Sequence, residues 1–223
     1  MRAPMALKVR HGTWITLVAL LLCLGALGLG AGSMGWQAPW AAWTDGAQAG
    51  DVAIVWQIRA PRTLGAALVG ALLGLAGALA QGLFRNPLAE PYLLGSSAGA
   101  GLCMALMLTI GLPWAVAEGW WARMGLTGAA FVGALGGVSL TLVLARGATH
   151  TLRLLLAGVV VGVVLGALTQ LMMVWSGEAW RVMQAFMLGN TALLGWDACA
   201  VLALALLVCL PAALVLARVL DAL

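Results

Sequence analysis

The stretch RTLGAALVGALLGLAGALAQGLFRNPLAEPYLLGSSAGAGL, residues 62–102, places two long apolar runs on either side of the polar segment RNPLAEP at 85–91. A proline disfavours helical geometry in the residue before it and has no backbone N–H to donate. Pro87 therefore predicts that the first apolar helix ends at Phe84. Pro91 fits the first turn of a second helix, where an intrahelical donor is not needed. We predict two helices joined by a stiff turn.

The rest of the chain is similarly apolar. Of its 223 residues, 64% are hydrophobic and 8% are charged. A soluble domain is about half apolar and about a quarter charged, so this composition is typical of a polytopic membrane protein. The net charge of +4 is spread thinly and argues against nucleic acid as a partner. The cysteines lie in apolar runs without metal-ligand spacing, so we interpret them as packing residues and predict no metal site.

Six segments are long and apolar enough to cross a bilayer, which takes roughly 20 residues. The apolar core of the first segment is longer than that of a signal peptide, so we interpret this segment as a retained span. The predicted fold class is all-α, a polytopic transmembrane helical bundle formed by residues 1–223 as a single domain. The predicted spans are 14–32, 63–84, 93–112, 125–145, 152–175 and 198–217.

Charge and tryptophan are distributed unevenly between the two predicted membrane sides. Placing both chain ends in the cytoplasm leaves seven of the eleven basic residues inside, as the positive-inside rule favours. Ten of the eleven tryptophans then fall in or beside outer connections, where indole rings prefer the headgroup region. Residues 178–190 are predicted to form a short amphipathic helix at the outer interface. Its side chains expected to face the bundle are Trp180, Met183, Met187 and Leu188.

Glycines recur at intervals of four residues within several predicted spans. On a helix this spacing puts them on one side, where the missing side chain allows close contact between helices in lipid. We therefore expect helix packing at a set of such positions. They are Gly70, Gly74, Gly95, Gly99, Gly158, Gly162 and Gly166, together with Gly133 and Gly137.

Ionisable side chains avoid the middle of every predicted span. Proton-coupled carriers and ion channels usually need such groups, so a transport path here would have to be driven by another subunit. His11 and His150 lie at span ends with no carboxylate partner nearby in sequence, and the common hydrolase and metalloprotease motifs do not occur. The sequence therefore predicts neither an enzyme nor a directly bound cofactor.

A series of motifs follows along the chain: R-x-P-R at 59–62, GALAQG at 77–82, RNPLAEP, LLGSSAGA at 93–100, LRLLLAGVVVGVVLGALT and FMLGN. With them the chain resembles the permease family of ABC importers for iron chelates, haem and cobalamin, over about residues 52–220. The resemblance implies an all-helical importer subunit in a bacterial inner membrane. It also implies a homodimer or a pair of permease subunits, ATP bound by cytoplasmic ATPase subunits, and a substrate-binding protein outside.

The resemblance implies a docking role for the arginines of R-x-P-R. In the family these residues face the outside and help to dock acidic residues of the binding protein. Here they are Arg59 and Arg62, which the charge distribution also places outside. The alternative is that they only anchor the helix at the lipid headgroups, with their charged ends extended into water.

A second role implied by the resemblance is closure of the inner mouth of the translocation path. Asn86 and Leu88 match positions that contribute to it, although a plain helix stop explains them equally well. Thr149 and Thr151, just before the fifth span, are weaker candidates for the same mouth.

Members of this family usually continue beyond the sixth span, with a cytoplasmic segment that contacts the ATPase and with further spans. The chain is therefore expected to correspond to the N-terminal portion of such a permease. The leading hypothesis for its function is import of an iron chelate, that is, a siderophore. The alternatives are a haem or cobalamin importer permease, and a truncated membrane fragment that is not coupled to an ATPase.

Overall fold

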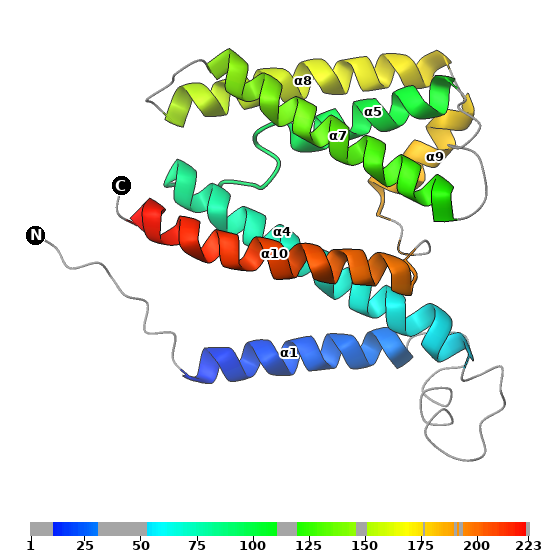
Figure 1. Cartoon of the computed structure of the whole chain (residues 1–223), viewed down its shortest axis with the longest axis vertical. Coiled ribbons are helices and arrows are strands. Elements are labelled where there is room, and N and C mark those ends of the chain that lie inside the picture. The colour runs from blue at the N-terminus through cyan, green and yellow to red at the C-terminus, as the bar shows by residue number, and fades with distance from the viewer. Residues whose placement is uncertain are drawn as a thin grey trace, which may run out of the picture. The chain divides into compact units, whose positions relative to one another are not determined.

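The computed structural model describes residues 11–30, 53–110, 120–145, 151–175, 177–189, 191 and 194–221. Within these residues all regular structure is helical, which confirms the predicted all-α class (Figure 1). The elements are α1 (His11–Gly30), the π-helix η1 (Ile54–Arg59), α4 (Ala60–Phe84), α5 (Ser96–Ile110), α7 (Trp120–Ala145), α8 (Thr151–Trp175), α9 (Gly177–Met187) and α10 (Trp196–Asp221).

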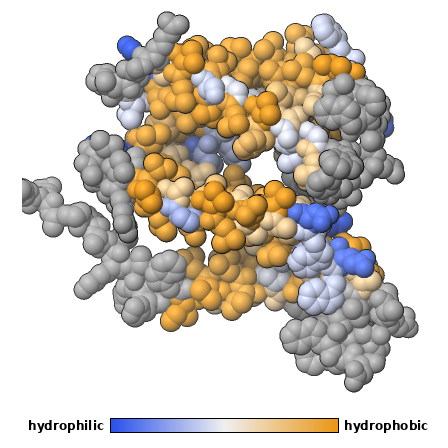
Figure 2. Space-filling model, viewed as in Figure 1, coloured by the Kyte–Doolittle hydropathy of each residue, from blue (hydrophilic) through white to orange (hydrophobic). Residues whose placement is uncertain are grey.

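Large apolar side chains cover the surface of these helices. Val174 is 79% exposed and Leu207 is 71% exposed, and hydrophobic residues dominate the coloured surface in Figure 2. Such exposure is costly in water and suits lipid or another membrane chain. Among the residues that the structure describes, four stretches could cross a membrane by length and composition, and two shorter apolar helices accompany them, so the chain is a multi-pass membrane protein. The four are Ile54–Phe84, Met124–Ala145, Thr151–Trp175 and Trp196–Ala217.

Most predicted helix ends lie close to the observed ones, but α5 starts later than expected. The prediction that Pro91 begins this helix is wrong, because residues 91–94 form a turn and α5 starts at Ser96. The turn is closed by a bond from the Gly95 amide to the Tyr92 carbonyl, 2.9 Å long. Gly95 has a φ of 78°, a left-handed conformation that glycine adopts without steric cost.

The helix that leads into the second predicted span starts earlier than expected, and this is the largest difference. The π-helix η1 precedes α4, so the backbone is helical from Ile54 rather than from residue 63. Pro61 is the second residue of α4, where the missing proline N–H is tolerated. At its other end α4 stops at Phe84, as Pro87 predicted.

The described chain forms two compact units. The first contains α1, η1, the part of α4 up to Ala71 and the part of α10 from Trp196 to Val208. The second contains the rest of α4, α5, α7, α8, α9 and the end of α10.

In the second unit α5 packs against α7, α8 and α9. The buried core there consists of Met104, Ala105, Met173 and Met183. Met183 comes from α9 and is fully buried, which confirms one contact expected of this amphipathic helix. Met187, one turn further along, is 58% exposed but also lies toward the bundle, because it lines a cavity with residues of α5 and α8. The expectation is wrong for Trp180 and Leu188, which are 44% and 84% exposed. A helix of this length turns only one narrow stripe inward, and Met183 and Met187, four residues apart, occupy it.

Some of the predicted glycine contacts hold α5, α7 and α8 together. A Cβ on Gly99 would overlap the backbone carbonyl of Gly133, and one on Gly158 would overlap the carbonyl of Leu93. A Cβ on Gly95 would lie 3.1 Å from Val161. At these positions the absence of a side chain lets two backbones approach, as the spacing predicted.

For four other glycines of the expected set, the described residues supply no such contact. Added Cβ atoms at Gly70, Gly74, Gly162 and Gly166 would meet no described atom within 4 Å. Spacing of four defines one side of a helix but not what lies opposite it. In α8, for example, Gly158 makes a backbone contact, whereas Gly162 and Gly166 on the same side of the helix face open space.

Candidate functional site

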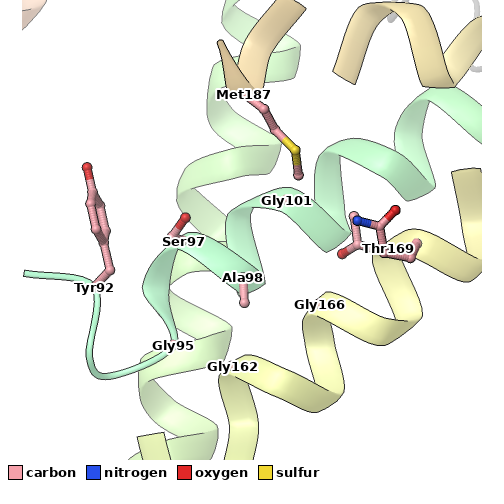
Figure 3. A pocket seen from close by; sticks show the side chains of 10 residues that line it. Tyr92, Gly95, Ser97, Ala98, Gly101, Gly162, Gly166, Thr169 and Met187 are labelled. Carbon is pink, nitrogen blue, oxygen red and sulfur yellow. The ribbon is translucent and has the colours of Figure 1, made fainter. Parts of the chain in front are cut away.

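The second unit contains a cavity of about 270 Å³ between α5, α8 and the end of α9 (Figure 3). Its wall is made mostly of small residues, which is why the space exists. Gly162 and Gly166 lie on consecutive turns of α8, and Ala98 and Gly101 lie across from them on α5 (Figure 3). The full lining is Tyr92, Gly95, Ser97, Ala98, Gly101, Gly162, Gly166, Thr169, Gln170 and Met187.

The polar groups of the cavity are neutral hydrogen-bonding groups. They are the hydroxyls of Tyr92 and Ser97 and the side-chain amide of Gln170. Thr169 contributes little, because its hydroxyl donates to the Leu165 carbonyl of its own helix at 2.8 Å. The described lining includes no Asp, Glu, Lys, Arg or His. The cavity can therefore bind an uncharged polar surface, but it offers no counter-ion for an anion.

Sequence reasoning did not single out Tyr92, Ser97 and Gln170 for a role. A usable signal existed for two of them, since Ser97 and Gln170 are uncharged polar residues within predicted spans. One sequence does not show that Ser97 and Gln170, which are far apart along the chain, line the same cavity. Nor does it show that a turn brings Tyr92 to that cavity.

The predicted inner-mouth residues Asn86 and Leu88 lie in the turn after α4. The Arg85 and Asn86 amides bond back to the Gly82 and Gln81 carbonyls, at 3.3 and 3.2 Å, and Arg85 has a φ of 48°. This is a helix end of the Schellman type with arginine where glycine is usual.

Side chains then fix the rest of this turn. The Asn86 Oδ1 accepts from the Leu88 amide at 2.9 Å, and the Gln81 Nε2 donates to the Pro87 carbonyl at 3.0 Å. Leu88 is held with 84% of its surface exposed. Thr151 is exposed at the start of α8, and Thr149 lies outside the described residues. The structure thus places Asn86 and Leu88 in one hydrogen-bonded turn.

The predicted docking residues Arg59 and Arg62 lie in the first unit, at the junction of η1 and α4. Arg59 is only 8% exposed, and its Nη1 donates to the Leu29 carbonyl at 3.0 Å. Arg62 is partly exposed on the first turn of α4. The two arginines of the motif therefore have different surroundings.

Pro61 creates an unusual acceptor at this junction. In η1 the carbonyl of one residue accepts from the amide five residues on, as the Ala60 amide does to Val55. Trp56 would need the amide of Pro61, which has none. The indole Nε1 of Trp196 donates to the Trp56 carbonyl instead, at 2.8 Å, and the two indole rings stack with centroids 6.4 Å apart.

A metal site receives no support from the geometry. Within the part of the chain that the structure describes, no group of three or more His, Cys, Asp or Glu side chains could hold a metal ion. The Cys199 thiol, for example, donates to the Pro61 carbonyl at 3.1 Å and serves helix packing.

These features define the class of the protein. It is a multi-pass helical protein with a neutral, glycine-walled cavity and no charged side chains in the described lining. Residues 16–223 match the model of the FecCD transport family, and the chain belongs to that family. Among curated proteins it is 43% identical over 160 residues to the vitamin B12 import system permease protein BtuC of Salmonella paratyphi A (strain ATCC 9150 / SARB42). It is 45% identical over 166 residues to the protein of the same name from Salmonella newport (strain SL254).

Each of these alignments covers 71% of this chain and 46% of the relative, so the chain spans about half the length of the curated relatives it matches. The fold is also similar to a solved inward-facing conformation of a metal-chelate type ABC transporter, with a TM-score of 0.66 and 24% identity. That likeness covers 84% of this chain and 56% of the other.

Proposed function

We propose that the chain is the permease portion of an ATP-driven importer that carries a corrinoid such as vitamin B12. The observation that carries this proposal is the identity of 43–45% to two proteins named as vitamin B12 import permeases. The iron-chelate hypothesis, placed first from the sequence, has less support than the cobalamin alternative. The solved metal-chelate transporter, at 24% identity, supports the fold alone.

The chemistry of the cavity supports an uncharged cargo. A corrinoid ring carries amide side chains on its rim, and these can exchange hydrogen bonds with Tyr92, Ser97 and Gln170. Haem propionates or an anionic ferric chelate would bring charge to a cavity whose described lining has no cation, and an unpaired charge is expensive to desolvate. At about 270 Å³ the cavity is smaller than the ~300–1,000 Å³ typical of whole-ligand sites. It would hold one edge of the cargo.

In the proposed assembly, other chains form the rest of the translocation path. A second permease copy or paired permease would face the cavity, cytoplasmic ATPase subunits would bind ATP, and a soluble binding protein would deliver the cargo. Within this assembly residues 1–223 would form one permease domain with six spans, α9 at the outer interface, and the N-terminus in the cytoplasm of the bacterial inner membrane. The excess of basic residues on the proposed inner side supports this orientation.

Residue roles follow the same orientation. Arg62, with Arg59 behind it, would meet acidic residues of the binding protein on the outer side. Asn86 and Leu88 would contribute to the inner closure, with Thr149 and Thr151 as further candidates. The hydrogen-bonded Asn86 turn and the 84% exposure of Leu88 support this role, because the turn holds an apolar side chain outward at a fixed place.

Uptake of radiolabelled cyanocobalamin tests the function. The native gene product, its intact mass determined, would be expressed with its own ATPase and binding protein in a bacterium that lacks its vitamin B12 permease. We expect uptake of cyanocobalamin and none of a ferric siderophore. Gly166→Leu, which fills the cavity, should abolish uptake, whereas Val174→Leu on the same helix, outside the cavity lining, should not. Uptake of the ferric siderophore alone would contradict the corrinoid proposal, and uptake of neither would favour the uncoupled fragment.

A further inference from the structure

A threonine near the end of α7 bonds to a distant part of the chain. The Thr141 side chain is fully buried, and its Oγ1 donates to the Leu94 carbonyl at 2.9 Å, across 47 residues. Thr109 and Thr169 instead donate to carbonyls four residues earlier in their own helices, both at 2.8 Å. A helical threonine commonly forms this local bond. Thr141 therefore supports the turn before α5 rather than its own helix.

The two carbonyls next to that of Leu94 are held by close glycine contacts. A Cβ on Gly158 of α8 would overlap the Leu93 carbonyl. On the other side, a Cβ on Gly137 of α7 would overlap the Gly95 carbonyl. Of these three successive carbonyls, the middle one accepts a side-chain hydroxyl. A buried backbone carbonyl needs a hydrogen-bond donor, most of all in a membrane, so removal of the hydroxyl should loosen the turn.

The same turn forms one wall of the cavity between α5, α8 and the end of α9. Tyr92, Gly95 and Ser97 line this wall, and the opposite wall belongs to α8 (Figure 3). α7 contributes no residue to the described lining. The α7 threonine therefore holds the wall from outside the cavity, and any effect that it has on a cargo has to pass through the turn.

We propose that Thr141 is a positioning residue of the cavity. Its bond to the Leu94 carbonyl fixes the turn, and with it the hydroxyls of Tyr92 and Ser97, at one distance from α8. That a corrinoid cargo meets these hydroxyls rests on the proposed function. The holding of the turn rests on the buried bond between distant segments and on the flanking glycine contacts.

Hydrogen–deuterium exchange measures the hold on the turn without any cargo. The native gene product would be exchanged in lipid nanodiscs, and peptides that cover residues 92–99 would be followed by mass spectrometry. Thr141→Val keeps the shape of the side chain and removes the hydroxyl. We expect it to speed exchange in this segment by about fivefold or more, because a buried carbonyl loses its donor.

Two matched variants separate the hydroxyl from other effects. Thr141→Ser keeps the hydroxyl and loses the methyl group, so exchange should stay close to that of the unsubstituted protein. Thr109→Val removes a hydroxyl whose bond stays within α5, so exchange at residues 92–99 should not change. If Thr141→Val does not accumulate in the membrane, Thr141→Ala against Thr141→Ser gives the same comparison, since alanine and serine differ by one hydroxyl.

Uptake of radiolabelled cyanocobalamin then shows whether the hold on the turn matters for transport. The chain would be expressed with its own ATPase and binding protein. Thr141→Val should lower uptake by about fivefold, and should do so less in a Tyr92→Phe background, because two residues that act through one wall are not independent. Thr141→Ser should retain most of the uptake, and Thr109→Val should match the unsubstituted protein.

Three results would overturn the proposal. One is unchanged exchange in Thr141→Val, and another is an equal effect of Thr141→Ser, which would make the methyl group the cause. The third is a loss of uptake in Thr141→Val that is as large with Phe at position 92 as with Tyr92, since the threonine would then not act through the wall. If exchange responds as expected but even the unsubstituted protein takes up no cyanocobalamin, the proposed function fails, whereas the role of Thr141 in holding the turn is confirmed.

Discussion

The contacts inside the first unit differ in kind from the main contacts inside the second unit. In the first, three backbone carbonyls, those of Leu29, Trp56 and Pro61, accept from side chains of distant residues. In the second, glycines let backbones of α5, α7 and α8 touch, and methionines fill the core. A polar bond gives a fixed point at a helix end, whereas glycine contact gives a long, close crossing in a membrane, where hydrophobic attraction between helices is absent.

The strongest way to break this contrast is to add a methyl group at the α5–α7 crossing. We expect Gly99→Ala to lower the free energy of unfolding by about 1–3 kcal/mol, since the new Cβ overlaps the Gly133 carbonyl and the backbones must separate. Thermal unfolding in detergent, followed by circular dichroism, measures it. Gly162→Ala, whose Cβ meets open space, is the matched control and should change stability little. Equal effects of the two substitutions would contradict the division between packing and open glycines.

In the first unit the corresponding change removes a donor. Trp196→Phe keeps an aromatic ring near Trp56 but leaves the Trp56 carbonyl without its indole donor. The expected loss is about 1 kcal/mol, limited because Trp196 is 45% exposed and water or headgroups can replace part of the bond. The same unfolding measurement applies, with Trp175→Phe as control, since Trp175 is 73% exposed on α8. If Trp196→Phe loses no more stability than Trp175→Phe, the bond from Trp196 to the Trp56 carbonyl does not contribute to stability.

The cavity offers a test that concerns access more than stability. Cysteine in place of Ser97 should react readily with a small water-soluble thiol reagent, because this position lines the cavity. Gly166→Leu, added to that variant, should slow the reaction because leucine occupies the space across from it. Val174→Leu should leave the rate unchanged. Slow labelling in all three variants would show that the cavity does not open to water.

The smallest expected effect is at the end of α4. Arg85→Gly should raise the free energy of unfolding by up to about 1 kcal/mol, because arginine is held at a φ of 48° and glycine adopts this conformation freely. Arg85→Ala, which keeps a Cβ and removes the charge, should give no such gain. A gain with alanine as large as with glycine would point to charge rather than backbone conformation as the cause.

The sequence by itself determined the class of the protein and much of its helix map. Composition and apolar run length are local quantities, so the helical spans, the stop at Phe84 after Pro87, and the motifs of the transport family could all be identified without coordinates. The start of α5 was missed because Gly95 in a left-handed conformation overrode the preference of Pro91 for a first helical turn.

Only the tertiary structure decided what each helix face meets. Gly158 and Gly162 have the same spacing signal, yet one touches the Leu93 carbonyl and the other opens a cavity. Arg59 and Arg62 belong to one motif, yet only Arg59 is buried, because the end of α1 lies against it. Periodicity fixes direction around a helix axis, but the partner in that direction comes from distant parts of the chain, and so does the role of the residue.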